Sequence, residues 1–289
     1  MSSETQLQAA MITAGITPPE SIAFDGVIHR HGVGGKPFWY VAHGDGVPAG
    51  SFGDWKTGHT GTWCAKRDHD LTDNERQVMR DRVKAAQRQR DAERDRIQAE
   101  ASSRALAIWT AAAPSIEHPY LTRKSIKAYG TRTDGPDLLI PMRDTSGKLW
   151  SLQTISPEGE KRFFFSGRVK ACYCSIGAPQ GRIVICEGYA TAATINESTG
   201  GGVVAAFSAG NLLSVALALR EKYPDMGITI AADDDWQTVG NPGLTAATAA
   251  ASAIGAKLAV PNFDGLVRGL KDTDWNDMAR LIREKETAS

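Results

Sequence analysis

Carboxylate residues directly follow two apolar segments in the C-terminal half of the chain. Arg182 to Cys186 has the pattern of a buried strand and is followed by Glu187-Gly188. Gly227 to Ala232 has the same pattern and is followed by Asp233-Asp234-Asp235. The carboxyl ends of the strands in a parallel sheet meet at one edge, where ligands bind. We therefore expect Glu187 to lie beside the Asp233/Asp235 pair.

Carboxylates gathered at one edge repel one another and resist ionisation unless a cation lies among them. Oxygen ligands without histidine or cysteine favour a hard ion, so the pattern predicts Mg²⁺, with Mn²⁺ as a substitute. A third acidic stretch, Lys271 to Asp277, follows the last apolar segment and strengthens this interpretation. Mg²⁺ held by a few carboxylates usually shares its coordination with phosphate, which indicates phosphoryl-transfer chemistry.

The elements that must position these carboxylates alternate between strand and helix patterns. Helices are predicted at 189–198, 211–222 and 242–254, the last with proline in its first turn. Further strands are predicted at 203–207 and 257–260. A β-α-β-α-β-α-β order indicates an α/β fold, a doubly wound parallel sheet with helices on both faces.

This arrangement resembles the Toprim domain of bacterial-type primases, topoisomerases and some nucleases. The matching motifs are Glu187-Gly188, Asp233-Asp234-Asp235 and Lys271-Asp272-x-Asp274. The amino-acid sequence around these motifs is closest to that of primases of plasmids and phages. The resemblance implies that Asp233 and Asp235 hold Mg²⁺, with Asp272 and Asp274 completing or supporting the metal site. It leaves Glu187 either as general acid/base or as a metal ligand. Asp234 and Asn276 are expected to hold the ligating carboxylates in place.

A basic segment precedes the first of these motifs. Strands are predicted at 138–144 and 149–155, joined by a hairpin turn at 145–148. Residues 120–170 carry ten Lys or Arg against five Asp or Glu, whereas residues 181–289 carry nine against thirteen. The order of these segments is similar to the amino-terminal half of a primase core. By that resemblance, the residues expected to bind nucleic acid or nucleoside triphosphates are Lys161, Arg162, Arg168 and Lys170.

The N-terminal region has a different character. Short aromatic runs between glycine turns predict a small antiparallel sheet, whose Trp39, Tyr40, Trp55 and Trp63 either stack on bases or fill a small core. Thr72-Asp73-Asn74-Glu75 is a capping box that opens a long charged helix to about Ala113, interpreted as a spacer, with nucleic-acid binding as the alternative. Four segments are therefore expected: a β-rich module at 1–70, a helical linker at 71–113, a basic α+β lobe at 114–180 and a Toprim domain at 181–289.

Composition sets outer limits on the class of protein. The 289 residues are 42% hydrophobic and 23% charged, as in soluble globular proteins, and no apolar run is long enough for a membrane span. No signal peptide is evident, and four cysteines without a disulfide framework fit a cytoplasmic location. Zinc is not expected, because His29, His31, His43, His59 and His69 match no zinc spacing with Cys64.

The function expected from these residues and from the resemblance is DNA primase activity: a nucleotidyltransferase that makes short RNA primers on single-stranded DNA with Mg²⁺. Its expected partners are a single-stranded DNA template and nucleoside triphosphates, and the resemblance also suggests a replicative helicase acting in trans. No membrane partner is expected. Two alternatives stay open. One is a Mg²⁺-dependent Toprim nuclease, and the other is a non-catalytic accessory protein of replication that binds single-stranded nucleic acid.

Overall fold

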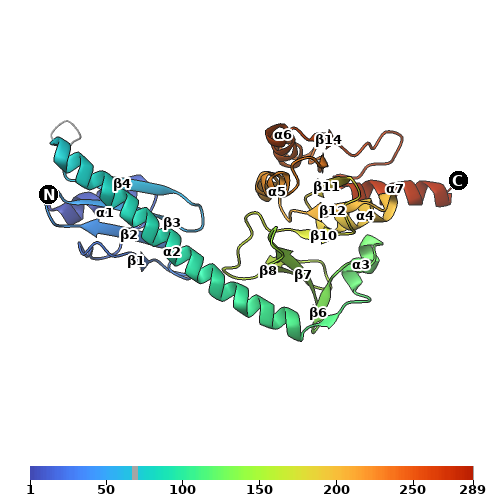
Figure 1. Cartoon of the computed structure of the whole chain (residues 1–289), viewed down its shortest axis with the longest axis horizontal. Helices are drawn as coiled ribbons and strands as arrows, with labels where there is room; N and C mark the ends of the chain where they lie inside the picture. The colour runs from blue at the N-terminus through green and yellow to red at the C-terminus, as the bar shows by residue number, and fades with distance from the viewer. Residues whose placement is uncertain (67–70, 289) are drawn as a thin grey trace. The chain divides into compact units, whose positions relative to one another are not determined.

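The computed structural model describes residues 1–66 and 71–288, which form two compact units, Met1–Arg96 and Ile97–Ser289 (Figure 1). The predicted capping box is present: the Thr72 N–H donates to the Glu75 carboxylate at 2.8 Å, and the Glu75 N–H donates to Thr72 Oγ1 at 3.3 Å. His69, one of the five histidines weighed for zinc, lies outside the described residues. No helix in the described part of the chain is long and apolar enough to cross a membrane.

The first unit is a four-stranded antiparallel meander covered by helices. Its elements are α1 (Ser3–Thr13), β1 (His29–His31), β2 (Phe38–His43), β3 (Ala49–Asp54), β4 (Thr60–Cys64) and the first part of α2 (Asp73–Ala111). Tyr40 packs in a core with α1, and Trp39 packs in another with Ala86 of α2. Both rings are buried, so the structure assigns them to the core and not to base stacking.

The second unit begins with a small antiparallel sheet in the order β5-β6-β7-β8-β9. Ala105, on the last part of α2, packs against Leu149 and Leu152 of this sheet, so the end of the helix is part of a core and not a free spacer. The predicted hairpin is confirmed, with Leu138 opposite Ile155 across β7 and β8. The elements are β5 (Ala113–Pro114), α3 (Pro119–Lys124), β6 (Arg132–Asp134), β7 (Asp137–Arg143), β8 (Leu149–Ile155) and β9 (Lys161–Phe163).

The predicted parallel sheet follows and is confirmed, in the strand order β10-β12-β11-β13-β14. Its elements are β10 (Cys174–Ile176), β11 (Arg182–Cys186), α4 (Tyr189–Thr199), β12 (Gly202–Ala205), α5 (Ala209–Lys222), β13 (Gly227–Ala231), α6 (Pro242–Ile254), β14 (Lys257–Ala259) and α7 (Trp275–Ala288). Two features were not predicted. Strand β10 adds an antiparallel edge, and the acidic stretch after β14 leads into α7.

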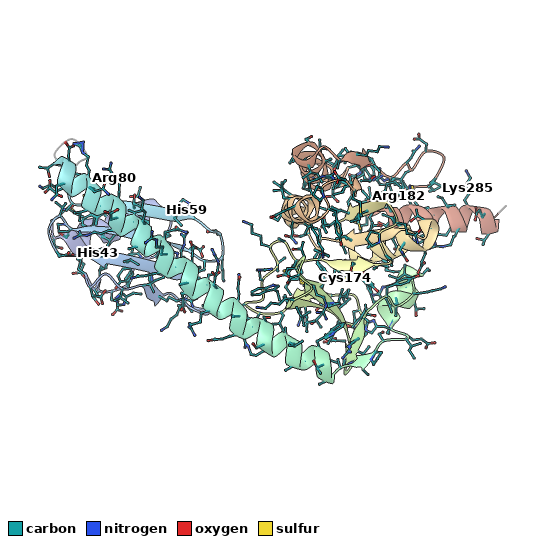
Figure 2. All side chains as sticks on the ribbon, in the orientation of Figure 1. His43, His59, Arg80, Cys174, Arg182 and Lys285 are labelled. Carbon is teal, nitrogen blue, oxygen red and sulfur yellow. The ribbon has the colours of Figure 1, made fainter. Side chains whose placement is uncertain are left out.

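Both faces of this sheet are covered, as a doubly wound fold requires. Helices α5 and α6 pack on one face around Ile185 and Ile230, and α4 packs on the other around Cys186 and Tyr189 (Figure 1). Arg182, labelled in Figure 2, marks the amino end of β11. The carboxyl end of that strand is Cys186, and Glu187 follows it directly.

Candidate active site

Neighbouring parallel strands bring the predicted acidic residues to one edge of the sheet. Strands β11 and β13 pair directly, with Ile185 opposite Ile230, so Glu187 and Asp233 follow adjacent strand ends. Burial and, after it, the nearby negative charges of Asp274, Glu187 and Asp235 raise the pKa of Asp233 to about 8. Asp235 and Asp274 are thus close enough for their charges to act on Asp233 and on Glu187.

Asp233 is the least compensated of these carboxylates. Among the described residues its Oδ1 atom is buried without any hydrogen-bond partner. An unpartnered buried oxygen on an acidic side chain is costly when the group is ionised. The side chain therefore requires either a proton or a bound cation.

Glu187 has partial compensation from two sides. Burial and the negative charge of Asp235 raise its pKa, while the Ala209 N–H at the start of α5 and the Lys161 ammonium lower it. The helix N-terminus and a lysine are both groups that favour an anion. Glu187 is therefore held beside other acids without a dedicated counter-ion.

Asp235 is fixed by the amino end of α6. Its Oδ2 accepts a hydrogen bond from the Gly243 N–H at 2.9 Å, and its own N–H donates to Asn241 Oδ1 at 2.8 Å. A Cβ atom on Gly243 would lie 2.8 Å from Asp235 Oδ2 and 2.9 Å from the Asp233 carbonyl oxygen. Position 243 therefore has no room for a side chain while Asp235 keeps this orientation.

Asp274 reaches the same edge through the start of α7. Its Oδ1 accepts from the Asp277 N–H at 2.9 Å, and Asp277 Oδ2 accepts from the Asp274 and Thr273 N–H groups at 3.4 and 3.1 Å. Trp275 Nε1 donates to the Ala232 carbonyl at 3.1 Å, which ties the start of the helix to the end of β13. The capping pair thus positions the Asp274 carboxylate beside Asp233.

Two other predicted residues, Asp272 and Asn276, have different surroundings. Asp272 Oδ1 accepts from Arg280 at 2.6 Å and its Oδ2 accepts from the Gly269 N–H at 2.7 Å, so both oxygens already have partners. Asn276 is 3% exposed and donates to the Lys124 carbonyl and to Thr194 Oγ1, each at 2.8 Å. Its contacts join α7 to α3 and α4. The structure does not direct Asp272 or Asn276 toward Asp233.

Asp234 is held by an arginine that the sequence did not single out. Arg268 donates to Asp234 Oδ2, to the Asp234 carbonyl and to the Asp272 carbonyl, each at 2.8 Å. Its guanidinium lies over the rings of Phe263 and Trp236, 4.0 and 5.0 Å from their centroids. Arg268 therefore joins the two loops that carry the acidic motifs. A lone arginine in a loop gave no signal for this role.

The predicted basic residues divide into different groups. Lys161 is an exposed residue of β9 that lies near the carboxylates. Its pKa is lowered, first because its ammonium loses part of its hydration and then by the charge of Lys124, although Asp274, Glu187 and Asp233 act in the opposite direction. Arg168 is paired with Asp144 at 3.0 Å and its guanidinium lies 3.8 Å from the Trp150 ring centroid. Arg162 is paired with Glu160, and both Arg162 and Lys170 are exposed.

Lys124 is a second cation at this edge that the sequence analysis missed. Its Nζ lies 3.5 Å from Asp277 Oδ1, and its positive charge lowers the pKa of Lys161. The signal for it was weak, because Lys124 lies on the short helix α3, far in sequence from every acidic motif. With Lys161 it offers two ammonium groups to an anionic ligand.

The donor set fits Mg²⁺ that shares its coordination with a substrate. In the part of the chain that the structure describes, no three His, Cys, Asp or Glu side chains are gathered tightly enough to hold a metal ion by themselves. Mg²⁺ is normally held by one or two carboxylates plus water and substrate phosphates, so a complete protein cage is not needed. The unpartnered Asp233 Oδ1 supplies an open ligand position.

Comparison with known proteins agrees with this geometry. Residues 182–282 match the model of the Toprim domain, the family that the motifs in this part of the chain resemble. The chain is also similar to curated DNA primases. It is 38% identical over 279 residues to a DNA primase TraC of Escherichia coli, covering 90% of this chain and 19% of that protein. A second DNA primase TraC of Escherichia coli is 39% identical over 244 residues, covering 80% of this chain and 23% of that protein.

The chain thus spans about one fifth of the length of these curated relatives. Among solved structures, the primase fragment of the bacteriophage T7 primase-helicase protein covers 60% of this chain and 73% of its own, with 16% identity and a TM-score of 0.43. The DnaG primase catalytic domain bound to ssDNA covers 68% of this chain and 77% of its own, with 13% identity and a TM-score of 0.42.

Proposed function

We propose that this chain is the catalytic core of a DNA primase, which joins ribonucleotides on a single-stranded DNA template. The observation that carries the proposal is the buried Asp233 carboxylate, flanked by Asp235, Glu187 and Asp274 on a sheet edge that also presents Lys161. The relatives named DNA primase support the choice of reaction among the activities that a Toprim domain serves.

In this proposal Asp233 and Asp235 hold Mg²⁺ together with the phosphates of the incoming nucleotide, and Mn²⁺ serves as a substitute. When bound, the ion neutralises the triphosphate and favours loss of pyrophosphate. Asp274 supports the same site. Asp272 joins the ligand set only if its carboxylate leaves Arg280, with which it is paired at 2.6 Å.

The protein's own groups prepare the site for this chemistry. Lys124 binds phosphate oxygens of the incoming nucleotide that face away from the carboxylates, and Lys161 binds a phosphate of the template strand. In this proposal Glu187, whose pKa is raised toward neutral pH, accepts the proton of the attacking 3′-hydroxyl. Arg268 and Asn241 fix Asp234, and through the chain also its two neighbours, so that Asp233 and Asp235 do not move apart.

The decisive experiment is synthesis on a bare template. The protein is incubated with single-stranded DNA, Mg²⁺ and labelled ribonucleotides, and the products are separated by length. Short RNA products that require both template and Mg²⁺ are expected. Degradation of the DNA with no RNA product identifies a Toprim nuclease, and binding of DNA without either reaction identifies a non-catalytic accessory. A replicative helicase added in trans tests whether a partner increases the yield.

A further inference from the structure

Two aromatic side chains, one on β9 and one in the turn after it, are exposed. Phe163 and Phe165 are 43% and 79% exposed. Phe164, between them, packs with Leu139, Leu149 and Leu152 in the core under α2. One of three consecutive phenylalanines therefore fills the core, and the other two stay at the surface.

The geometry of β9 places Phe163 on the same face as Lys161. Successive side chains of a strand alternate between its faces, so residues 161 and 163 share one face and lie about 7 Å apart. Strand β8 agrees with this placement, because Ile155 is opposite Lys161 and Gln153 is opposite Phe163. An ammonium group and an aromatic ring thus stand side by side on one strand.

This face is directed toward the acidic edge. The charges of Asp274, Glu187 and Asp233 act on Lys161. The Phe163 ring meets Phe207 edge-on, with centroids 6.4 Å apart, and the Phe207 N–H donates to the Glu187 carbonyl at 2.7 Å. One contact therefore separates the exposed ring from the backbone of Glu187.

The strand is also open on its outer side. β9 ends the sheet order β5-β6-β7-β8-β9, and its only strand partner in the described residues is β8. Phe165 lies two residues further along, in the turn that follows. The two rings and Lys161 form what we call the β9 platform, defined as Lys161, Phe163 and Phe165.

We propose that the β9 platform binds a single strand of nucleic acid, with Lys161 on a backbone phosphate and Phe163 and Phe165 stacked on successive bases. Cations that follow a phosphate backbone beside rings that accept any base are the usual means of binding a single strand without sequence preference. The inference rests on the proposed function, because it assigns the template-binding surface of that site.

Binding without synthesis tests the platform. Fluorescence anisotropy in EDTA measures the affinity for labelled oligo-dT and for an abasic oligomer with the same number of phosphates. Stacking is worth about 1–3 kcal/mol per base, so the double variant F163L/F165L should bind oligo-dT at least about tenfold more weakly. Its affinity for the abasic oligomer should not change, and the substitution Phe163→Trp should retain the binding of oligo-dT.

Leu217→Ala, on the exposed face of α5, is the matched control and should bind both oligomers as the unchanged protein does. Circular dichroism verifies that each variant is folded. Three results overturn the inference: equal affinity of the unchanged protein for both oligomers, full affinity of the double variant for oligo-dT, or a loss confined to labelled free ribonucleotides. If the rings govern binding but no RNA is made under any condition, the proposed function fails and the platform stands.

Discussion

Replacing Asp233 with asparagine should stabilise the metal-free protein at neutral pH. The pKa of this carboxyl is raised to about 8 by burial and by three neighbouring acids, and its Oδ1 is buried without a partner in the described structure. An amide carries no charge into this environment. The variant therefore avoids an electrostatic penalty that the native residue meets above its unfolded pKa.

The sign and size of the pH dependence follow from linkage. An acid whose pKa is higher in the folded state than in the unfolded state binds more protons when folded, so folding stability falls as pH rises. For Asp233 the fall begins near the unfolded value of 3.8 and continues to about 8. One proton limits the slope to ~1.4 kcal/mol per pH unit, so from pH ~5.5 to ~7.5 the loss is at most about 3 kcal/mol. Glu187, whose pKa is also raised, acts in the same direction.

The measurement is urea unfolding of both proteins in EDTA across this pH range. D233N should be the more stable protein at pH ~7.5, by about 1–3 kcal/mol, and should show a shallower decline with pH. Added Mg²⁺ should stabilise the native protein by mass action and D233N much less.

D272N is the matched control, because Asp272 is an acid of the same region with a different environment. It accepts from Arg280 and from the Gly269 N–H, so its replacement should destabilise the protein. The reasoning is refuted if D233N is less stable than the native protein at pH ~7.5, or if it keeps the native slope.

Three further predictions follow from contacts in the site. Gly243→Ala should strongly reduce Mg²⁺-dependent synthesis while circular dichroism shows a folded protein. Gly210→Ala, where an added Cβ meets nothing within 4 Å, should leave synthesis unchanged. Equal activity of the two variants contradicts the role of position 243. Arg268→Lys should raise the Mg²⁺ concentration needed for half-maximal synthesis, because one ammonium cannot replace three hydrogen bonds, and the exposed Arg283→Lys should not. Lys161→Met should weaken single-strand binding and lower its log-log salt slope by about 0.7, whereas Arg168→Met should mainly lower thermal stability; the reverse pattern contradicts this division.

The sequence was sufficient to predict that Glu187 and Asp233 lie close together, because this prediction depends on patterns within short segments. Glu187 and Asp233 each follow a strand whose apolar pattern is clear, and parallel strands place their carboxyl ends together by geometry alone. Only the strand order had to be right for these residues to meet. The parallel sheet, its helices and the N-terminal meander were predictable for the same reason, since each depends on patterns within one short segment.

The pattern did not distinguish Asp272 from Asp274, because both follow the same strand in one short motif. The difference is set by partners elsewhere. Arg280, two turns along α7, pairs with Asp272, while Trp275 ties the neighbourhood of Asp274 to the end of β13. Helix α7 itself was not predicted, so neither partner could be placed. Arg268 was missed because its three acceptors lie on two different loops.

The predicted basic residues show a second limit of prediction from the sequence. All four predicted cations have the same charge and precede Glu187 in sequence, but only the pairing of β9 with β8 shows that Lys161 faces the acids. Arg168 was predicted on the same grounds, its charge and its position before Glu187, and it is paired with Asp144. Charge alone predicts that a segment binds anions, whereas the face of a strand decides which side chain reaches them.

The supports around the acidic edge explain why the site depends on a ligand. Asp235 has the Gly243 N–H, Glu187 has the Ala209 N–H and Asp234 has Arg268, but Asp233 has no comparable donor on its Oδ1 in the described structure. A fold that compensated all four acids would be more stable without metal and would leave no open ligand position for Mg²⁺. Asp233, which lowers stability at neutral pH, would therefore gain from a cation and its phosphate ligands. Stability and activity should respond to Asp233→Asn in opposite directions, which a change confined to the scaffold would not produce.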